Sequence, residues 1–309
     1  MSIQLEKRVS KPEGNSCAPG FGEDPQPPSG ASVILDEAAD CLRELHGDAI
    51  DSLTVERVVV GVFFTGVKFS DGSTGVAYTP PELIERASTR ILGDSRRAYR
   101  GRSAAEMIGS SIDGPFGHVI RLAAVNALSV PLFQRGCFET AGSGDLSSIS
   151  ELFAGRKVCM VGAIIPLLRK LGDLGAAEIA IIDKKKETRD EATLGRFVPV
   201  EKTAETLKAC QTAVFTGAAI ANGTIDELLG WVPKHAAIAV VGPTAGFVPT
   251  PLFRRGVAVV GTVMVTDGDR ALEVLSEGGG GYRLFKQCVT KMNLVNPLAL
   301  ANIETRQNS

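Results

Sequence analysis

The sequence predicts an α/β fold in two parts, in which a small α+β unit precedes a parallel sheet covered with helices on both faces. After residue 157, five short, apolar, β-branched segments alternate with helical stretches, a pattern typical of a buried parallel sheet. Before it come amphipathic helices and a hairpin pattern. A stretch rich in Gly and Ser lies between the two parts and is typical of a connection.

These patterns predict five regions in a chain of 309 residues. We expect a disordered tail at 1–30, an α+β domain at 31–130, a linker at 131–150, a sheet domain at 151–295 and a C-terminal tail at 296–309. The tail at 1–30 holds five prolines among glycines and polar residues, and such a composition buries too little apolar surface to offset chain entropy.

Composition and charge exclude several classes of partner. Hydrophobic residues make up 44% and charged residues 22%, with a formal net charge of -2, so no excess basic charge favours nucleic acid or an anionic membrane. The first ten residues lack the apolar centre of a secretory signal, and no apolar run reaches about 18 residues. We therefore expect a cytoplasmic protein with a small-molecule or metal ligand, and the sequence leaves a homo-oligomer open.

The cysteines and histidines show no metal-binding spacing. No C-x-x-C pair occurs among the six cysteines, and the three histidines form no H-x-x-x-H helix face. Reduced, mostly buried thiols are the interpretation that this scatter favours. The residues concerned are Cys17, Cys41, Cys137, Cys159, Cys210, Cys288, His46, His118 and His235.

The first part begins with an amphipathic helix after Ser32, where apolar residues recur at intervals of three and four. Two β-rich runs follow at 55–70 and 75–79, and Asp71-Gly72 between them suits a tight hairpin turn. Pro80-Pro81 then opens a helix, and another helix is predicted at 115–128.

In the second part the sequence predicts strands that alternate with helices. The strands are expected at 157–162, 178–183, 212–217, 236–242 and 257–265, and the helices at 166–175, 204–210, 224–231 and 269–278. Because ligands of parallel sheets bind beyond the carboxyl ends of the strands, the loops that follow these strands are the candidate site.

Gly162 ends the first of these strands, and Asp183 ends the second about 20 residues later, as the ribose-binding acid of a dinucleotide fold would. The turn after Gly162 lacks the later glycines of a G-x-G-x-x-G fingerprint, which argues against a nicotinamide cofactor. A tight strand-to-helix turn at Gly162 and a solvated carboxylate at Asp183 remain the structural alternatives.

Two further loops and the first part supply polar candidates. The loop after the third strand offers hydroxyls, backbone amides and an amide side chain able to hold a carboxylate, and the fourth loop is stiffened by prolines. The candidates are Thr216, Gly217, Asn222, Gly242, Pro243 and Thr244, with Thr65, Lys68 and Asn126 from the first part. A solvated Lys68 and a helix-packing Asn126 are the alternatives to a ligand role.

Taken in order, several segments resemble the putative heavy-metal chelation family. They are VVVGVFFTGVKFSDGSTGVAYT, RLAAVNAL, KVCMVGAIIP, TGAAIANGTIDELL, VVGPTAGFVPTPLFRRGV, VVGTVMVTD and SEGGGGYR, within residues 32–294. The resemblance implies a Rossmann-like second domain, an enolase N-terminal-like first domain, and a site in the cleft between them that handles a heavy metal or a metal chelate. The chain departs from the family where Ile165, rather than the more usual aromatic residue, precedes Pro166.

A metal held here would come inside an organic chelator or be met by oxygen ligands such as Asp183 and Asp267. We expect the candidates from both parts, Pro166 and Asp267 included, to converge on one cleft. The sequence names no catalytic residue. A nucleotide-dependent enzyme that uses NAD or S-adenosylmethionine, and a non-catalytic binding or sensor protein, are the alternative functions.

Overall fold

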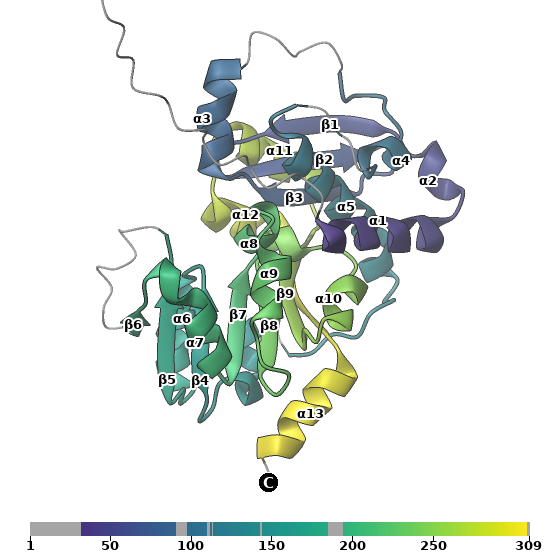
Figure 1. Cartoon of the computed structure of the whole chain (residues 1–309). Coiled ribbons are helices and arrows are strands. Elements are labelled where there is room, and N and C mark those ends of the chain that lie inside the picture. Colours follow the sequence, from purple (N-terminus) through teal and green to yellow (C-terminus); the bar gives the residue numbers. More distant parts are fainter. Residues whose placement is uncertain are drawn as a thin grey trace, which may run out of the picture.

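The computed structural model describes residues 32–90, 98–109, 112, 114–142, 144–184 and 194–307 (Figure 1). The predicted tail at 1–30 lies outside these residues. Within the described part, a three-stranded antiparallel sheet with its helices precedes a seven-stranded, mostly parallel sheet with helices on both faces. The predicted fold class, an α/β protein in which a small α+β unit precedes a mostly parallel sheet, is confirmed. No helix in the described ranges is both long and apolar enough to cross a bilayer.

The first sheet has the order β1-β2-β3, with strands β1 (Val55–Val60), β2 (Phe64–Phe69) and β3 (Thr74–Tyr78). The predicted turn at Asp71-Gly72 joins β2 to β3, and Gly72 has a φ of 87°. The run at 55–70 was predicted as a single strand, but it folds into two antiparallel strands that turn at Gly61. Gly61 permits this turn because a Cβ there would lie 2.7 Å from the carbonyl oxygens of Phe64 and Leu275.

The described residues of the first part form five α-helices. They are α1 (Val33–His46), α2 (Ala49–Ser52), α3 (Pro81–Arg90), α4 (Ala104–Met107) and α5 (Gly117–Gln134). Ser32 caps the start of α1, where its side chain accepts a hydrogen bond from the Leu35 amide. Helix α5 is buried along most of its length and packs on β2 and β3, where Gly75 allows the two backbones to touch.

The large sheet has the order β10-β9-β8-β7-β4-β5-β6, and only β10 runs antiparallel. Its strands are β4 (Lys157–Val161), β5 (Glu178–Ile182), β6 (Arg196–Phe197), β7 (Thr212–Thr216), β8 (Ala237–Val241), β9 (Val259–Val265) and β10 (Val289–Val295). All five predicted strands are present. β10 was not predicted, because its Lys291 and Asn293 interrupt the apolar run that marks a buried strand.

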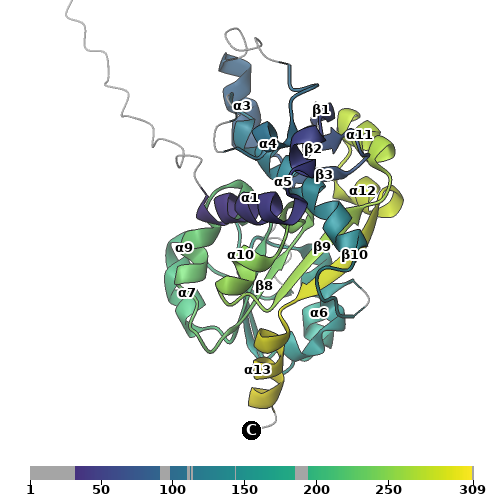
Figure 2. The same cartoon turned by 90° about the vertical axis from the view of Figure 1, so that its right-hand side faces the viewer.

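The helices of the second part include all four that were predicted. They are α6 (Ile165–Asp173), α7 (Thr203–Ala209), α8 (Ala218–Ala221), α9 (Ile225–Gly230), α10 (Thr250–Arg254), α11 (Gly268–Ser276), α12 (Gly281–Gln287) and α13 (Pro297–Gln307). Helix α13 occupies the segment that was predicted as a C-terminal tail, and it projects from the end of the large sheet in Figure 2.

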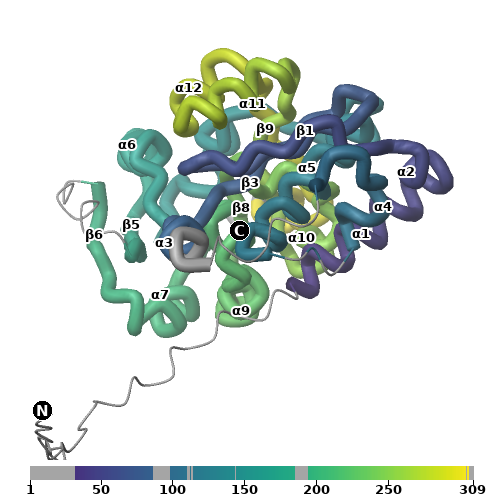
Figure 3. Tube along the Cα trace, turned by 90° about the horizontal axis from the view of Figure 1, so that it is seen from above, coloured from purple at the N-terminus to yellow at the C-terminus, as the bar shows by residue number. Residues whose placement is uncertain are grey.

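Helix α11 belongs to the second part in sequence but packs on β1 and β2 of the first sheet. The view from above shows α11 and α12 beside the first sheet (Figure 3). Leu272 and Leu275 reach the sheet where Gly66 has no side chain, since a Cβ at Gly66 would lie 2.5 Å and 2.9 Å from their methyl carbons. The first sheet is therefore enclosed by α5 on one face and α11 on the other, which secures the two parts to each other.

A second contact joins α1 to α10 and α9, which lie side by side in Figure 2. Arg255 donates two hydrogen bonds of 2.9 Å to the carboxylate of Glu37 and lies 3.5 Å from Asp226. These hydrogen bonds, and then the charges of Glu37 and Asp226, raise the pKa of Arg255 against the opposing effect of burial. A bidentate, partly buried pair of this kind fixes orientation as well as distance.

The segment predicted as a linker at 131–150 is largely built into the fold. α5 continues through Pro131 to Gln134, although the proline has no N–H to donate to the turn before it. Residues 139–141 then run along β10, where Ala141 donates to the Asn293 carbonyl oxygen at 3.0 Å and Thr140 bridges Leu294. This pairing brings the loop at 144–145 against β10 of the large sheet.

Candidate functional site

A cavity of about 990 Å³ lies at the carboxyl edge of the large sheet. Strands β4, β5, β7 and β8 end at its wall, and β9 and β10 pass beside it. Its lining from the second part includes Asp145, Val161, Gly162, Ala163, Pro166, Lys170, Asp183, Lys184, Thr216, Gly217, Ala218, Asn222, Trp231, Gly242, Pro243, Thr244, Gly261, Phe285 and Lys291. The volume suits an organic molecule of cofactor or drug size.

The first part contributes a smaller, largely aromatic section of the wall, namely Phe64, Tyr78, Pro81 and Glu82. The Phe64 and Tyr78 rings meet edge to face, with centroids 6.4 Å apart. Burial, and then the negative charges of Glu82 and Asp183, raise the pKa of the Tyr78 hydroxyl. Tyr78 is therefore a protonated hydrogen-bond donor at neutral pH.

Nine of the thirteen predicted site residues line this cavity. They are Gly162, Pro166, Asp183, Thr216, Gly217, Asn222, Gly242, Pro243 and Thr244. Each ends or follows a strand of the parallel sheet, and these strand ends meet along one edge. Thr65, Lys68, Asn126 and Asp267 are not part of the lining.

The turn after β4 is built around Gly162. Its φ is 83°, and a Cβ would lie 2.3 Å from Thr216 Oγ1. Asp183 Oδ2 accepts a hydrogen bond of 2.7 Å from the Ala163 amide, so this carboxylate holds the turn that follows Gly162. In a dinucleotide site the equivalent acid would instead bind ribose hydroxyls.

The loop after β8 is held by the first part of the chain. Thr244 Oγ1 accepts a hydrogen bond of 2.9 Å from the Tyr78 amide. Asn126, 3% exposed, donates through Nδ2 to the carbonyl oxygens of Val76 at 2.7 Å and of Pro243 and Thr244 at 3.2 Å. Asn126 thus acts behind the cavity wall, because it joins α5 and β3 to the loop that forms the wall.

Three predicted residues lie elsewhere for clear physical reasons. Lys68 was expected at the cleft or in solvent, but its Nζ bonds Asp269 at 2.8 Å and Glu56 at 3.1 Å and links the first sheet to α11. Thr65 is fully buried, and its hydroxyl lies 3.0 Å from that of Thr79. Asp267 caps α11 by accepting from the Arg270 amide at 3.0 Å. Each side chain is occupied by structure away from the cavity.

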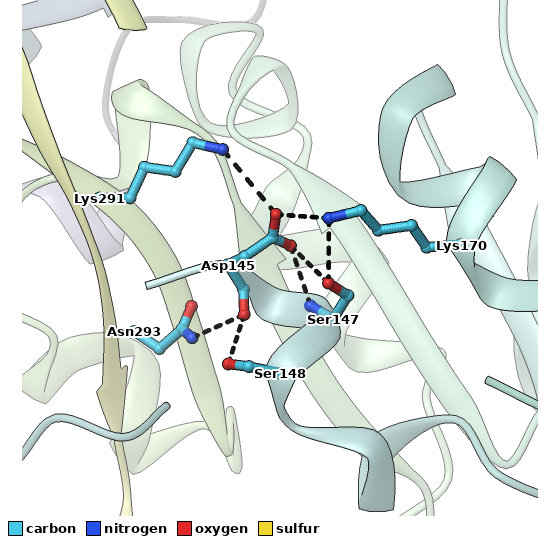
Figure 4. Close-up of polar contacts among 6 residues, drawn as sticks. All are labelled: Asp145, Ser147, Ser148, Lys170, Lys291 and Asn293. Carbon is cyan, nitrogen blue, oxygen red and sulfur yellow. Dashed lines mark hydrogen bonds and ion pairs between the residues drawn. The ribbon is translucent and has the colours of Figure 1, made fainter. Parts of the chain in front are cut away.

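A charged cluster in the cavity wall, formed by Asp145, Lys170 and Lys291, was not predicted from the sequence (Figure 4). Asp145 Oδ2 lies 2.8 Å from Lys170 Nζ and 3.9 Å from Lys291 Nζ. The three residues come from a loop, from α6 and from β10, so no local spacing signals the cluster. Taken singly, each is a charged residue of the kind that usually faces solvent.

The side chains present do not fit a bare heavy-metal ion. Across the described ranges, no three His, Cys, Asp or Glu side chains come together in a way that could hold a metal. Burial raises the pKa of the Cys159 thiol to about 12 and that of the Cys210 thiol to about 11, so neither is a thiolate at neutral pH. The predicted oxygen ligand Asp267 lies outside the cavity lining.

The ionised Asp145 carboxylate should make the free energy of unfolding depend on pH in the acid range. Burial, the largest single influence, raises its pKa, but hydrogen bonds from Lys170 and Ser147 outweigh burial and lower the pKa from 3.8 to about 2. A carboxylate with a lowered pKa stabilises the fold above its unfolded pKa and loses this contribution as pH falls through the folded pKa. Between pH 4 and 2 we expect a loss of about 1 kcal/mol, since solvent screens a partly exposed pair.

Urea unfolding between pH 5 and 2 measures this loss as a difference between variants. Asp145→Asn should lack it, whereas Asp173→Asn, which removes an exposed carboxylate at the end of α6, should keep it. Equal pH dependence of the parent and Asp145→Asn would contradict the assignment.

Comparisons with known proteins agree with this architecture. A model of the family described as putative heavy-metal chelation matches residues 145–294, and a second model with the same description matches residues 43–129. Together the matches span more than half of the chain. No curated protein matches it.

Two solved structures of the same family, both described as having unknown function, are similar in fold. The protein from Pyrococcus horikoshii is 20% identical with a TM-score of 0.65, over 85% of this chain and 100% of its own. The protein from Desulfitobacterium hafniense is 20% identical with a TM-score of 0.62, over 85% and 98%. The chain belongs to the family described as putative heavy-metal chelation.

Proposed function

We propose that this protein binds an organic metal chelate in the cavity at the carboxyl edge of the large sheet. The metal is then cargo, coordinated by the chelator, and the protein recognises the organic shell. The observation that carries the proposal is a cavity of about 990 Å³ with no cluster of three metal-ligating side chains among the described residues. A family description that names heavy metals supports it.

The chemistry of the wall suits such a ligand. Apolar and aromatic side chains, Phe64 and Trp231 among them, supply the contact area that most small-molecule sites use. Asn222, Thr216 and the Tyr78 hydroxyl supply a few polar groups that can fix orientation. Stiff loops that end in glycine and proline preorganise these groups, which lowers the entropy cost of binding.

A nucleotide-dependent enzyme is less well supported by the same residues. Asp183 is bonded to the Ala163 amide within the turn, and the glycines that would let a pyrophosphate approach the backbone are missing. Thermal shift with NAD and S-adenosylmethionine separates the two hypotheses. A ligand at 100 times its Kd adds about 2.7 kcal/mol to stability, so a clear shift with either cofactor would favour the nucleotide hypothesis.

Calorimetry with free and chelated metal tests the proposal directly. The probes are Ni²⁺ and Zn²⁺ alone, ferric citrate, nickel nitrilotriacetate and a ferric trihydroxamate. We expect at least one chelate to bind and the free ions to bind weakly or not at all. Binding of the free ions alone, or silence across all chelates, would refute the proposal.

A variant that fills part of the cavity tests whether the chelate binds there. Ala218 lines the cavity, and Ala218→Phe should weaken chelate binding at least tenfold because the ring occupies the ligand's volume. Ala209→Phe, an exposed position on α7 outside the lining, is the matched control and should bind as the parent does. Circular dichroism checks that both variants are folded. Unchanged affinity in Ala218→Phe would move the site elsewhere.

A further inference from the structure

The cluster of Asp145, Lys170 and Lys291 is built by the surrounding backbone, which holds the carboxylate in one place. Gly144 has a φ of 80°, and a Cβ there would lie 2.3 Å from the carbonyl oxygen of Lys291, so the loop is pressed against β10. Asp145 Oδ1 accepts from the Ser147 amide at 3.1 Å and from the Ser147 hydroxyl at 2.8 Å.

The main chain of Asp145 is held as well. Its carbonyl oxygen accepts from the Ser148 hydroxyl at 2.7 Å and from Asn293 Nδ2 at 3.1 Å, as Figure 4 shows. Asn293 lies on β10 and is 1% exposed. Asp145 therefore has a fixed position in the cavity wall.

The two lysines differ in how fully Asp145 engages them. Lys170 Nζ donates to Asp145 Oδ2 at 2.8 Å and to the Ser147 hydroxyl at 3.3 Å. Lys291 Nζ lies 3.9 Å from the same oxygen, beyond hydrogen-bond distance, and 5.9 Å from the centroid of the Phe285 ring. Their side chains are 49% and 51% exposed, so an incoming ligand can reach both ammonium groups.

The cluster carries one net positive charge, since two ammonium groups surround one carboxylate. The pKa of Asp145, about 2, keeps that carboxylate ionised throughout the neutral range, so the excess charge does not vary there. Asp183, another carboxylate of the lining, follows β5, which four strands separate from the β10 strand of Lys291. The cluster thus adds one positive charge to the Lys291 side of the cavity.

From this arrangement we infer that Asp145, Lys170 and Lys291 form a subsite for a carboxylate of the ligand, with Lys291 as its main donor and Lys170 as its second. The inference rests on the proposed function and adds to it the ligand class, a polycarboxylate chelator. One excess positive charge matches one carboxylate, whereas a dianionic phosphate would need further donors. The Ser147 amide already bonds Asp145.

The Asp145 carboxylate then competes with the ligand carboxylate for the two lysine ammonium groups. Exposed and half-exposed ion pairs contribute little net stability, so a ligand carboxylate can displace this pairing at small cost. The fixed Asp145 also repels a second anion, which limits the subsite to one carboxylate. Removal of the Asp145 charge should therefore strengthen ligand binding, an effect that a purely structural aspartate would not show.

Calorimetry with tricarballylate, a metal-free tricarboxylate, tests the subsite in the full chain. Parent protein should bind it, and Lys170→Met and Lys291→Met should each weaken binding roughly tenfold, because each loses a hydrogen bond between charged groups. Lys208→Met, at an exposed position on α7 outside the cavity, is the matched control and should bind like the parent. Asp145→Asn, which keeps the capping oxygen, should bind several-fold more tightly.

Each other outcome overturns the inference. These outcomes are a parent that does not bind tricarballylate, lysine variants that bind as the parent does, tighter binding of inorganic phosphate than of tricarballylate, and Asp145→Asn with unchanged or weaker binding. The subsite and the proposed chelate function can be refuted independently. If the parent binds the ferric trihydroxamate, which carries no carboxylate, but not tricarballylate, the subsite is wrong and chelate binding stands. If the parent binds tricarballylate through the two lysines but binds no chelate, the subsite stands and the proposed chelate function is wrong.

Discussion

Gly75→Ala should destabilise the protein by about 3–5 kcal/mol. Gly75 lies in β3 against α5, where a Cβ would be 2.2 Å from the Ala127 amide nitrogen and 2.3 Å from the Ala123 carbonyl oxygen. Both atoms are backbone, so no side chain can rotate away, and the whole helix must move. Because α5 is buried along most of its length, that movement disturbs the core of the first part.

Urea unfolding measures the loss, and Gly230→Ala is the matched control. Gly230 ends α9, and a Cβ there meets no atom within 4 Å. This variant should be stabilised by about 0.5–1 kcal/mol, because alanine loses less conformational entropy than glycine in a helix. If Gly75→Ala lies within 1 kcal/mol of the parent, the close contact of β3 with α5 is wrong.

Asn126→Leu should lower the free energy of unfolding by about 2–3 kcal/mol and weaken chelate binding about tenfold. Leucine keeps the approximate volume but donates nothing to the carbonyl oxygens of Val76, Pro243 and Thr244, which stay buried. The loop after β8 then loses its tie to the first part, and the cavity wall at Thr244 loosens. Asn126→Asp should be worse, since a carboxylate would face three carbonyl oxygens.

Unfolding and calorimetry together separate the two effects. Asn296→Leu, which removes an asparagine at the start of α13 away from the cavity lining, should change stability without changing chelate affinity. If Asn126→Leu loses stability but binds the chelate as tightly as the parent, Asn126 supports only the fold. If it loses neither, the three hydrogen bonds carry no net energy.

Residues close in sequence account for the predictions that succeeded. Apolar runs with β-branched residues placed the strands β4, β5, β7, β8 and β9, and periodicity of three and four placed α1, because these patterns arise from local geometry. Since parallel strands end at one edge, the same patterns also brought Gly162, Thr216 and Gly242 to one cavity. The turn at Gly61 was not predicted, because the apolar residues on both sides of Gly61 form a pattern typical of one continuous strand.

Packing between distant segments accounts for the failures. Lys68 was assigned to the cleft, but it pairs with Asp269 on a helix that the sequence places in the other part. That helix, α11, has the apolar face expected of a cover for the large sheet, and nothing in its pattern says which sheet it covers. Gly61 and Gly66 leave room for α11 on the first sheet, because a Cβ at either position would contact Leu272 or Leu275. The sequence around the two glycines does not show which helix will pack there.

The sequence by itself determined where five strands of the large sheet and the four helices among them lie, the edge at which the strand-end loops meet, and the absence of a dinucleotide fingerprint, because each depends on spacing along the chain. The tertiary structure alone decided that Asn126 holds the wall instead of lining it, and that Asp145, Lys170 and Lys291 share one end of the cavity. Those three charges lie on separate segments. The pairing of residues 139–141 with β10 and the packing of α6 bring both lysine ammonium groups within 4 Å of Asp145 Oδ2. Charge clusters of this kind are invisible to local patterns, since each member alone has the character of a solvated surface residue.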